Sequence, residues 1–427
     1  MADGASVSAV KKIIESDAAR KYVVVSAPGK RFGGDTKVTD LLYACHADLV
    51  MSGSCAESFK KVRARYESIV KELKLKMDIV SVLDETEARI EEERSEDFTA
   101  SRGEYLSARV MAELLHIGFI DSEDVVFFKS DGRLDAERTY GAISKVTADG
   151  KPAVFPGFYG QDGEGKVKTF PRGGSDISGA IVARAVDASV YENWTDVSGF
   201  LACDPGIVNC PRRIKNLSYN EMRVLSYMGA SVLHSDSIFP VIKAKIPIVI
   251  KNTFRPQDDG TTILPGSQCR QRDAVITGIA GKKNFTVILI EKNHMNTEIG
   301  FVRKVLSVLE SEGISVEHIP TGIDTMSVVV DSNGIDGYKL ERVIQGIKRQ
   351  AAPDVIRVMH DVALIATVGR GISSSIGTYA RLFKAMAEAH VNAKMIDLGS
   401  SELNIIVGVS NGDCERCIAA IYHEFFG

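Results

Sequence analysis

The sequence predicts an α/β fold: a mostly parallel sheet sandwiched by helices, followed by two copies of a smaller β-α-β-β unit. Three observations predict it. Short apolar runs alternate with amphipathic segments over the first part of the chain, a stretch rich in Pro, Gly and Asp follows at 254–266, and the chain then repeats its own pattern. Because 427 residues exceed what one hydrophobic core usually supports, we divide the chain into domains at 1–265, 266–352 and 353–427.

Buried strands explain the apolar runs of the first part. The runs are rich in β-branched and aromatic residues, are bounded by turn residues, and lie at 21–27, 125–128, 152–158 and 246–252. Uninterrupted apolar runs suit strands that are covered on both faces. Amphipathic helices are predicted at 104–118 and 175–186, and the acidic run at 84–97 is interpreted as the solvated face of a helix. This alternation predicts a parallel sheet.

The segment 254–266 is interpreted as a linker, after which the pattern changes. Each repeat has a strand, a glycine-containing helix, a pair of strands and a further helix. In the first repeat these elements are predicted at 284–292, 298–313, 314–320, 325–332 and 338–350. In the second repeat they are predicted at 362–370, 373–390, 391–399, 402–410 and 414–426.

Composition excludes several classes of protein. With 44% hydrophobic and 25% charged residues the chain is an ordinary globular sequence, and its net charge of -4 gives no reason to expect nucleic acid or anionic membrane as a partner. No apolar stretch is long enough to span a bilayer, and the N-terminus lacks the pattern of a secretory signal. Seven scattered cysteines indicate reduced thiols in the cytoplasm. The pair Cys414 and Cys417 stands alone, so no metal site is predicted.

The most informative stretch is FPRGGSDISGA at 170–180. Two glycines allow the backbone to approach an oxyanion, and Ser175 and Asp176 stand where a helix begins, with free N–H groups that bind phosphate well. Arg172 beside them can hold a carboxylate or phosphate through two parallel hydrogen bonds. The alternative is a well-capped turn between a loop and a helix.

Two other stretches carry candidate binding residues. SRGE at 101–104 places Glu104 at a predicted helix start, where it can bind an ammonium group or stabilise the helix dipole. WTDVSGFLACDP at 194–205 offers Thr195, Asp196 and Asp204 beside apolar groups, as an adenine or ribose pocket needs. The alternative for these acidic residues is that they face solvent on turns.

Together these pieces resemble one family. The order SAPGK, TKVTDLL, SRGEYLSA, FPGFYG, RGGSD, WTDVSGFLACDP, LSYNEM, GASVLH, IPIVIKNTF and GTTI is similar to aspartate kinase nearly from end to end. The two repeated units resemble the tandem C-terminal ACT domains of that family, which are ferredoxin-like βαββαβ folds. Because no dehydrogenase domain follows, the resemblance is to the monofunctional bacterial enzymes. It implies the amino-acid-kinase fold for residues 1–265.

The resemblance also implies an activity and a site. The activity is phosphorylation of the β-carboxylate of L-aspartate by ATP with Mg²⁺, the first step of lysine, threonine and methionine biosynthesis. The resemblance assigns substrate binding to Thr39, Glu104, Phe158, Arg172 and Ser175, catalysis to Arg172, Ser175 and Asp176, and nucleotide binding to Ser26, Thr195, Asp196, Asp204 and Lys251. Arg172 would hold the α-carboxylate and Glu104 the α-ammonium of aspartate. Phe158 has the alternative of a core aromatic.

The chain departs from the family pattern in two places. In the nucleotide turn an aromatic residue and an arginine are replaced by Leu201 and Gly206, and Arg212, Arg213 or Lys215 are the candidates to substitute. The family also opens with a strand ending in K-F-G-G-[ST]-S, whose lysine reaches the transferring phosphoryl group, and the first domain lacks this strand. The RFGG at 31–34 does not replace it, because its flanks belong to the family's second loop.

These departures leave two hypotheses open. In the first, the chain is a working aspartate kinase whose start lies one strand too late, and the 427-residue chain alone is nearly inactive. In the second, it is a catalytically impaired regulatory subunit that bears ACT domains and pairs with a complete kinase. A related kinase acting on another carboxylate or carbamate is a third interpretation.

The resemblance further implies regulation. Lysine is the expected feedback inhibitor, with threonine as co-effector or alternative, and ACT domains are expected to pair chains into a homodimer or higher homo-oligomer. By position the effector site would be lined by Met295, Gly300, Phe301, Val316 and Glu317. The alternative is that Met295 and Phe301 belong only to the core.

Overall fold

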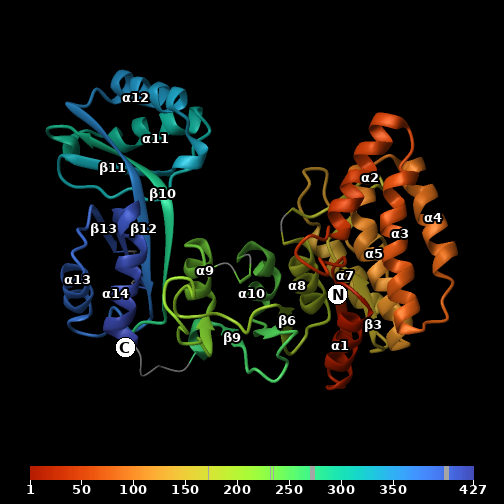
Figure 1. Ribbon diagram of the computed structural model, residues 1–427. Coiled ribbons are helices and arrows are strands. Elements are labelled where there is room, and N and C mark those ends of the chain that lie inside the picture. Colours follow the sequence, from red (N-terminus) through yellow and green to blue (C-terminus); the bar gives the residue numbers. More distant parts are fainter. Residues whose placement is uncertain (172, 231, 234, 270–274, 399–402) are drawn as a thin grey trace. The chain divides into compact units, whose positions relative to one another are not determined.

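The structure is a computed structural model of the 427-residue chain, which divides into two compact units. The first unit contains residues 1–200 and 232–268, and the second contains residues 201–231 and 269–427 (Figure 1). The structure describes residues 1–171, 173–230, 232–233, 235–269, 275–398 and 403–427.

A parallel sheet of three strands begins the first unit. Its central strand β3 (Ala153–Pro156) lies between β1 (Tyr22–Val25) and β2 (Gly118–Phe119) and is parallel to both. The strands predicted at 21–27 and 152–158 are therefore confirmed, although both are shorter than predicted.

A second group of strands contains the predicted strand at the end of the first domain. Strand β8 (Ile248–Asn252) pairs in parallel with β6 (Tyr191–Thr195) and antiparallel with β9 (Thr261–Leu264). The interpretation of 254–266 as a linker was wrong, because β9 lies within it. The fully buried Ile263 shows why: the segment returns to the core after a polar turn.

The predicted strand at 125–128 was wrong. Residues Ser122–Val125 form the short helix α6, whose first turn is capped by the Asp121 side chain. Phe127 and Phe128 make only isolated bridges. Phe128 packs in a hydrophobic cluster with Val125 and Val126, and Phe127 is buried, so burial and not a strand ladder explains this apolar run. A short antiparallel hairpin is formed by β4 (Tyr159–Gln161) and β5 (Val167–Thr169).

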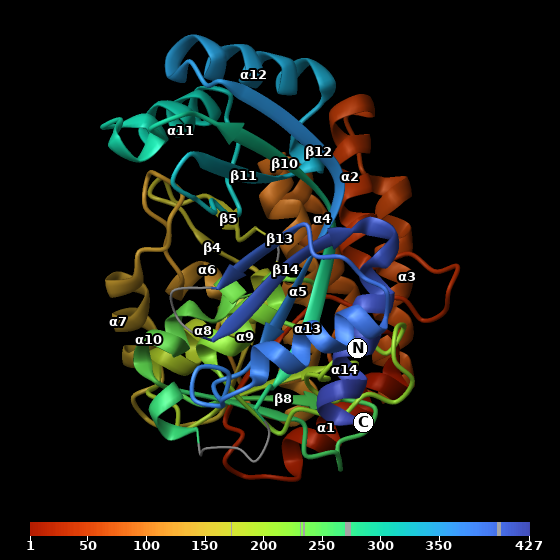
Figure 2. The same ribbon diagram turned by 90° about the vertical axis from the view of Figure 1, so that its left-hand side faces the viewer.

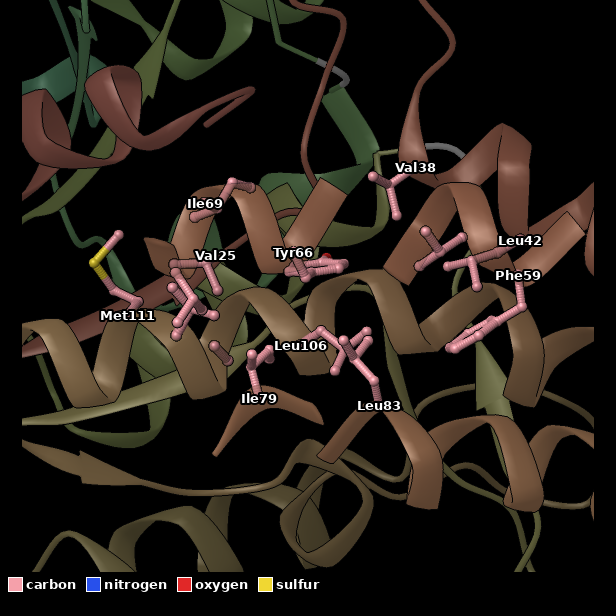
Figure 3. Close-up of a cluster of buried hydrophobic side chains, with 14 of the residues drawn as sticks. Val25, Val38, Leu42, Phe59, Tyr66, Ile69, Ile79, Leu83, Leu106 and Met111 are labelled. Atoms are coloured by element: carbon pink, nitrogen blue, oxygen red, sulfur yellow. The ribbon is translucent and has the colours of Figure 1, made fainter. Parts of the chain in front are cut away.

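Long helices supply the main core of the first unit. Buried side chains from α1 to α5 and β1 meet in one cluster, of which Figure 3 shows the part around Tyr66 and Leu106. Tyr66 donates a hydrogen bond of 2.6 Å from its hydroxyl to the carbonyl oxygen of Gly103, which satisfies its buried polar group. The helices are α1 (Gly4–Glu15), α2 (Val38–Ser52), α3 (Ala56–Leu73), α4 (Ile79–Glu93), α5 (Glu96–Leu115), α7 (Ala136–Val146), α8 (Gly174–Ala185) and α10 (Phe239–Ala244), with short 3₁₀ turns η1 (Ser235–Ile238) and η2 (Gly266–Gln268).

Helix α5 begins earlier than the sequence pattern predicted. The acidic run contains the boundary between two helices. Helix α4 ends before Arg94, which has a left-handed backbone. Ser95 then caps α5 by accepting a hydrogen bond from the N–H of Phe98. Residues 101–104 therefore lie in the second and third turns of α5, and not at a helix start.

The second unit is dominated by an antiparallel sheet of five strands in the order β11-β10-β12-β14-β13. Figures 1 and 2 show the two long strands β10 and β12 running the length of the unit, with α11 and α12 at one end and α13 and α14 at the other. The elements are β7 (Asn216–Ser218), α9 (Tyr219–Tyr227), β10 (Gly278–Glu291), η3 (Met295–Thr297), α11 (Phe301–Ser311), β11 (Thr325–Asp331), η4 (Ser332–Gly334), α12 (Gly337–Ala351), β12 (Val355–Val368), α13 (Thr378–Glu388), β13 (Met395–Leu398), β14 (Asn404–Ser410), η5 (Asn411–Asp413) and α14 (Cys414–Phe426).

The predicted duplication is present in this sheet. Each repeat has a long strand, a helix that follows a left-handed glycine, an edge strand and a closing helix; the glycines are Gly300 (φ 81°) and Gly377 (φ 85°). The predicted strand at 314–320 makes only isolated bridges to β11. Residues 399 and 402 of the predicted strands lie outside the described residues. In the described part of the chain, no helix is both long enough and apolar enough to span a membrane.

Candidate active site

The first unit contains a cavity of about 590 Å³. Its walls come from five segments that are distant in sequence: the end of β1, α2, α5, the turn after β3, and the loop between β5 and α8. The described lining residues are Ser26, Thr39, Tyr43, Glu96, Asp97, Glu104, Phe158, Thr169, Phe170, Pro171, Gly173, Gly174, Ser175 and Asp176. Six residues that the sequence predicted for binding or catalysis thus meet in one place, while Arg172 lies outside the described residues.

Glu104 is the buried anion of this cavity. Its side chain is 5% exposed, and its Oε1 accepts a hydrogen bond of 3.0 Å from the N–H of Ala27. Its Oε2 is buried and has no hydrogen-bond partner among the described residues. Burial raises the pKa of Glu104 to about 7. A buried carboxylate with an unused oxygen in a cavity is suited to a cationic ligand.

The glycine-rich loop forms the wall that contains the start of α8. Gly173 has φ 78° and precedes the first helical residue, Gly174, where a Cβ atom would lie 2.3 Å from the Phe158 ring. Both glycines are therefore required by backbone shape and close packing. The loop exposes the N-terminus of α8, with Ser175 in its first turn, to the cavity. Such an N-terminus binds anionic oxygens through its free N–H groups.

Phe158 holds an unusual backbone conformation at the edge of the cavity. Its φ is 79°, which costs a bulky residue conformational energy. Two hydrogen bonds fix it: its N–H donates to the Ser178 hydroxyl at 2.9 Å, and its carbonyl accepts from the N–H of Phe170 at 2.8 Å. Because Phe158 is only partly buried and lines the cavity, a purely core role does not account for it.

Asp176 is oriented by a residue that the sequence reasoning missed. The buried Asn193 of β6 donates a hydrogen bond of 2.8 Å from Nδ2 to Asp176 Oδ1, and Tyr191 donates from its hydroxyl to the carbonyl oxygen of Asp176 at 3.1 Å. Nothing in the sequence around Asn193 marks this role, because Asp176 lies 17 residues away. The contact fixes a carboxylate at the cavity wall.

Comparison with known proteins identifies the family of the chain. The model of the amino acid kinase family matches residues 2–252, and an ACT domain model matches residues 365–425. Aspartokinase 3 of Bacillus subtilis is 37% identical, over 100% of this chain and 96% of that protein. The crystal structure of Clostridium acetobutylicum aspartate kinase, described as an allosteric enzyme, matches with 48% identity and a TM-score of 0.94, over 99% of this chain and 97% of that one. The chain belongs to the aspartate kinase family.

A more distant relative confirms the fold over the whole chain. The structure of E. coli aspartokinase III in complex with aspartate and ADP is 23% identical, with a TM-score of 0.75, and covers 100% of this chain and 97% of that one. The predicted amino-acid-kinase fold followed by ACT-type domains is therefore confirmed, as is the assignment to a family of phosphotransferases.

The residues expected to bind nucleotide in this aspartate kinase family member lie in three places, of which the cavity contains Ser26. Thr195 and Asp196 stand at the carboxyl end of β6, and Lys251 lies on the paired strand β8, with its Nζ 5.5 Å from the centroid of the Trp194 ring. Asp204 belongs to the second unit, where its Oδ1 accepts a hydrogen bond of 2.7 Å from the N–H of Gly206. The nucleotide roles of these residues stay predictions.

The RFGG segment is a surface loop outside the cavity lining. Arg31 donates two hydrogen bonds to Asp35, from Nε at 2.9 Å and from Nη2 at 3.1 Å. The nearly buried Arg65 binds the same carboxylate at 2.8 Å. The hydrogen bond from Arg31 contributes most to a pKa of Asp35 well below its usual range. Phe32 is 63% exposed. That this loop does not cradle phosphate stays a prediction.

Three of the predicted effector residues, Met295, Gly300 and Phe301, lie at or just before the start of α11. Met295 and Phe301 are buried in the hydrophobic cluster of the first repeat, with Val316 packed against it, so both have the core role given as the alternative. Gly300 caps α11 with a left-handed backbone. Glu317 differs, because its Oε2 is buried with no hydrogen-bond partner in the part of the chain that the structure describes, and burial raises its pKa.

Some cavity residues were not predicted from the sequence. Glu96 and Asp97 line the cavity, whereas the acidic run that contains them was interpreted as a solvated helix face. Tyr43 of α2 and Thr169 of β5 also line it. Single polar residues inside amphipathic segments give no local signal, and only the fold brings them together.

Proposed function

We propose that this protein transfers the γ-phosphoryl group of ATP to the β-carboxylate of L-aspartate, which gives 4-phospho-L-aspartate and ADP. One observation carries the proposal: the unused oxygen of the buried Glu104 and the open N-terminus of α8 line the same cavity. A zwitterionic amino acid with a second carboxylate supplies one cation and two anions to such a site. Membership of the aspartate kinase family supports aspartate as that amino acid.

Each group of the site has a task in this reaction. Glu104 binds the α-ammonium of aspartate, and Arg172, which lies outside the described residues, is assigned to the α-carboxylate. Ser175 and the N–H groups at the start of α8 bind the oxygens of the acceptor and of the transferring group. Thr39 and Phe158 form the remaining walls around the amino acid.

The reaction requires correct positioning of the reactants more than activation of the nucleophile. The β-carboxylate of aspartate is already ionised at neutral pH, so no general base is needed to create the nucleophile. The site must hold the acceptor oxygen in line with the phosphorus and offset the charge that spreads over the phosphoryl oxygens. The first turn of α8, where Gly174 packs closely on Phe158, suits that task.

Mg²⁺ fits the residues of the cavity. The described lining residues include Glu96, Asp97, Glu104 and Asp176 but no lysine or arginine, so the negative charge of ATP needs cations from elsewhere. No cluster of three or more metal-binding side chains occurs among the described residues, which suits an ion carried by the ATP phosphates and held by one or two carboxylates. Mg²⁺ would neutralise phosphate charge, and Asp176, fixed by Asn193, is the candidate to hold it.

ATP binding is assigned to Ser26, Thr195, Asp196, Asp204 and Lys251. Ser26 lines the cavity. The turn after β6 is fixed by Asn252 of β8, which donates from Nδ2 to the carbonyl oxygen of Asp196 at 3.3 Å and to the Ser198 hydroxyl at 3.0 Å. A turn held in this way can receive a nucleotide without rearrangement.

Trapping of the acyl phosphate tests the reaction. The protein is incubated with ATP, Mg²⁺ and hydroxylamine, and hydroxamate is measured with L-aspartate or L-glutamate as acceptor. Hydroxamate formed from aspartate alone supports the proposal, and formation from glutamate would identify a related kinase. Binding of aspartate and ADP in calorimetry without any hydroxamate would support the regulatory-subunit hypothesis instead.

We also propose feedback inhibition by lysine, with threonine as co-effector or alternative, in a cytoplasmic homo-oligomer that pairs through its ACT domains. The unused buried oxygen of Glu317 is a suitable partner for an effector ammonium, and Asp331 adds to the unfavourable charge that such an ammonium would relieve. This function places the protein at the first step of lysine, threonine and methionine biosynthesis.

A lysine titration followed by turnover and sedimentation velocity tests the regulation. Lysine is expected to lower the rate and change the sedimentation coefficient, and Glu317→Gln is expected to abolish both effects. Unchanged rate and sedimentation in the wild-type protein would exclude lysine as effector, and the same titration with threonine then tests the alternative.

A further inference from the structure

Asp97 joins two walls of the cavity. It lies in the first turn of α5, and both of its carboxylate oxygens are used by β5. The Thr169 hydroxyl donates to Oδ1, and Lys168 donates from Nζ to Oδ2 at 2.8 Å. Asp97 and Thr169 both line the cavity, whereas Lys168 does not. The contact spans 72 residues of sequence, so it fixes elements and not a local turn.

The anchored strand leads directly into the anion-binding loop. Thr169 is the last residue of β5, and Ser175 follows six positions later at the start of α8. Between them, Phe170 donates its N–H to the carbonyl oxygen of Phe158 at 2.8 Å. The loop is therefore held at Thr169 by α5 and at Phe170 by the turn that follows β3.

The same helix carries the proposed ammonium-binding group. Glu104 stands seven residues after Asp97, which is two turns of α5, so both side chains lie on the same face. One helix thus presents the carboxylate for the ammonium of the substrate and anchors the loop for its carboxylates. A change at Asp97 alters the spacing between these two groups.

Two simpler roles of Asp97 predict different behaviour for its variants. A first-turn carboxylate stabilises the dipole of its own helix, which would make Asp97 a stability residue only. The ion pair with Lys168 is of the exposed kind that contributes little, because the side chains are 46% and 28% exposed. Neither role requires the hydroxyl of Thr169, a residue that lines the cavity.

We propose that Asp97 is a positioning residue for the acceptor amino acid: through Thr169 it holds the start of α8, at Gly174 and Ser175, at the distance from Glu104 that aspartate requires. This inference rests on the proposed function. We expect ADP binding to stay unchanged, because ADP lacks the phosphoryl group that the start of α8 is assigned to bind and Asp176 keeps its hydrogen bond from Asn193.

Calorimetric dissociation constants of the full chain for L-aspartate and for ADP with Mg²⁺ test this inference. Asp97→Ala and Thr169→Val are each expected to weaken aspartate binding about tenfold, as loss of one charge-assisted hydrogen bond does. The double variant is expected to be no weaker than either single variant. Asp97→Asn keeps an acceptor oxygen for Thr169 and is expected to restore most of the affinity. The ADP dissociation constant is expected to stay unchanged in all four proteins.

Lys168→Met is the matched control, because it removes the ion pair but keeps the hydroxyl bond, and less than a twofold change is expected. A folded Asp97→Ala protein with wild-type affinity for aspartate would overturn the proposal, as would additive losses in the double variant. Equal losses for aspartate and ADP would indicate a structural role. Absence of aspartate binding by the wild-type protein would overturn the proposed function together with this inference.

Discussion

Glu104 is where the requirements of folding and of function conflict. Its carboxyl group is buried, and burial raises its pKa from 4.5 to about 7 because the ionised form loses its hydration. Binding of an ammonium needs the ionised form. The free protein therefore carries an energetic cost at neutral pH that an amino-acid substrate relieves.

The stability of Glu104→Gln reveals this cost. A folded-state pKa above the unfolded value means that the protonated carboxyl favours folding below pH 4.5, and that this contribution is lost as the pH rises through 7. The difference of 2.5 pKa units (about 7 minus 4.5) corresponds to at most about 3 kcal/mol. Glu104→Gln is expected to raise the free energy of unfolding at pH 8 and to change it little at pH 4. Urea titrations at both values check this, and a gain that is independent of pH would contradict it.

The affinity for aspartate is expected to rise with pH as Glu104 ionises, whereas the stability contribution of Glu104 falls. Between pH 6 and 8 the wild-type protein is expected to bind aspartate more tightly as Glu104 ionises, because the charged groups of aspartate itself do not titrate in that range. Glu104→Gln is expected to bind at least about tenfold more weakly at pH 8, with a flat profile. Calorimetry at several pH values tests both points. A wild-type profile retained by the variant would assign the titration to another group.

At the scale of elements, the contact between the 173–175 loop and the turn after β3 determines the shape of the anion-binding wall. Gly174→Ala would place a Cβ atom 2.3 Å from the Phe158 ring and force one of the two segments to move. The expected result is about 1–3 kcal/mol lower stability and loss of aspartate binding. Gly33→Ala in the RFGG segment is the control, since no described atom lies within 4 Å of its added methyl group and both properties should stay unchanged. If the segment around Gly33 were a functional phosphate loop, Gly33→Ala would impair the protein more than Gly174→Ala.

Elements were predictable from the sequence where the signal is local. The strands at β1, β3 and β8 and the duplication in the second unit follow from apolar runs, turn residues and repeated patterns. The start of α5 was not predictable, because a left-handed Arg94 interrupts an acidic run without any glycine or proline. Strand β9 was missed because its pairing with β8 outweighs a polar, turn-rich composition.

The residues of the candidate active site were likewise predictable where local sequence marks them, and not where their contacts are distant in sequence. Motif residues such as Glu104 and Ser175 were predictable because they stand in recognisable stretches. Asp97 and Asn193 were not, because their partners Thr169 and Asp176 are 72 and 17 residues away and nothing in the flanking sequence marks them. Residues that orient other residues are found only when the fold is known.

At the scale of the whole molecule, the second unit joins its two repeats through one sheet. Strands β10 and β12 have 14 residues each and pair along nearly their full length, so each contributes to both repeats. Strands β11 and β14 lie on opposite sides of this central pair, and β13 forms the edge beyond β14. Neither repeat can lose its sheet without exposing the long strands of the other.

We therefore expect the two repeats to unfold as one cooperative unit. Ile288 of β10 packs in the first repeat and Ile365 of β12 is fully buried opposite Gly281 in the second. Replacing either by alanine is expected to cost about 2–5 kcal/mol. In native-state hydrogen exchange, each variant should reduce the protection of β11 and β14 amides by the same free energy. Ile323→Ala, at a residue that is 71% exposed, is the control and should change neither. If Ile288→Ala reduced protection in β11 alone, the repeats would be independent domains, and an effector bound at Glu317 would need contacts other than the shared sheet to influence the second repeat.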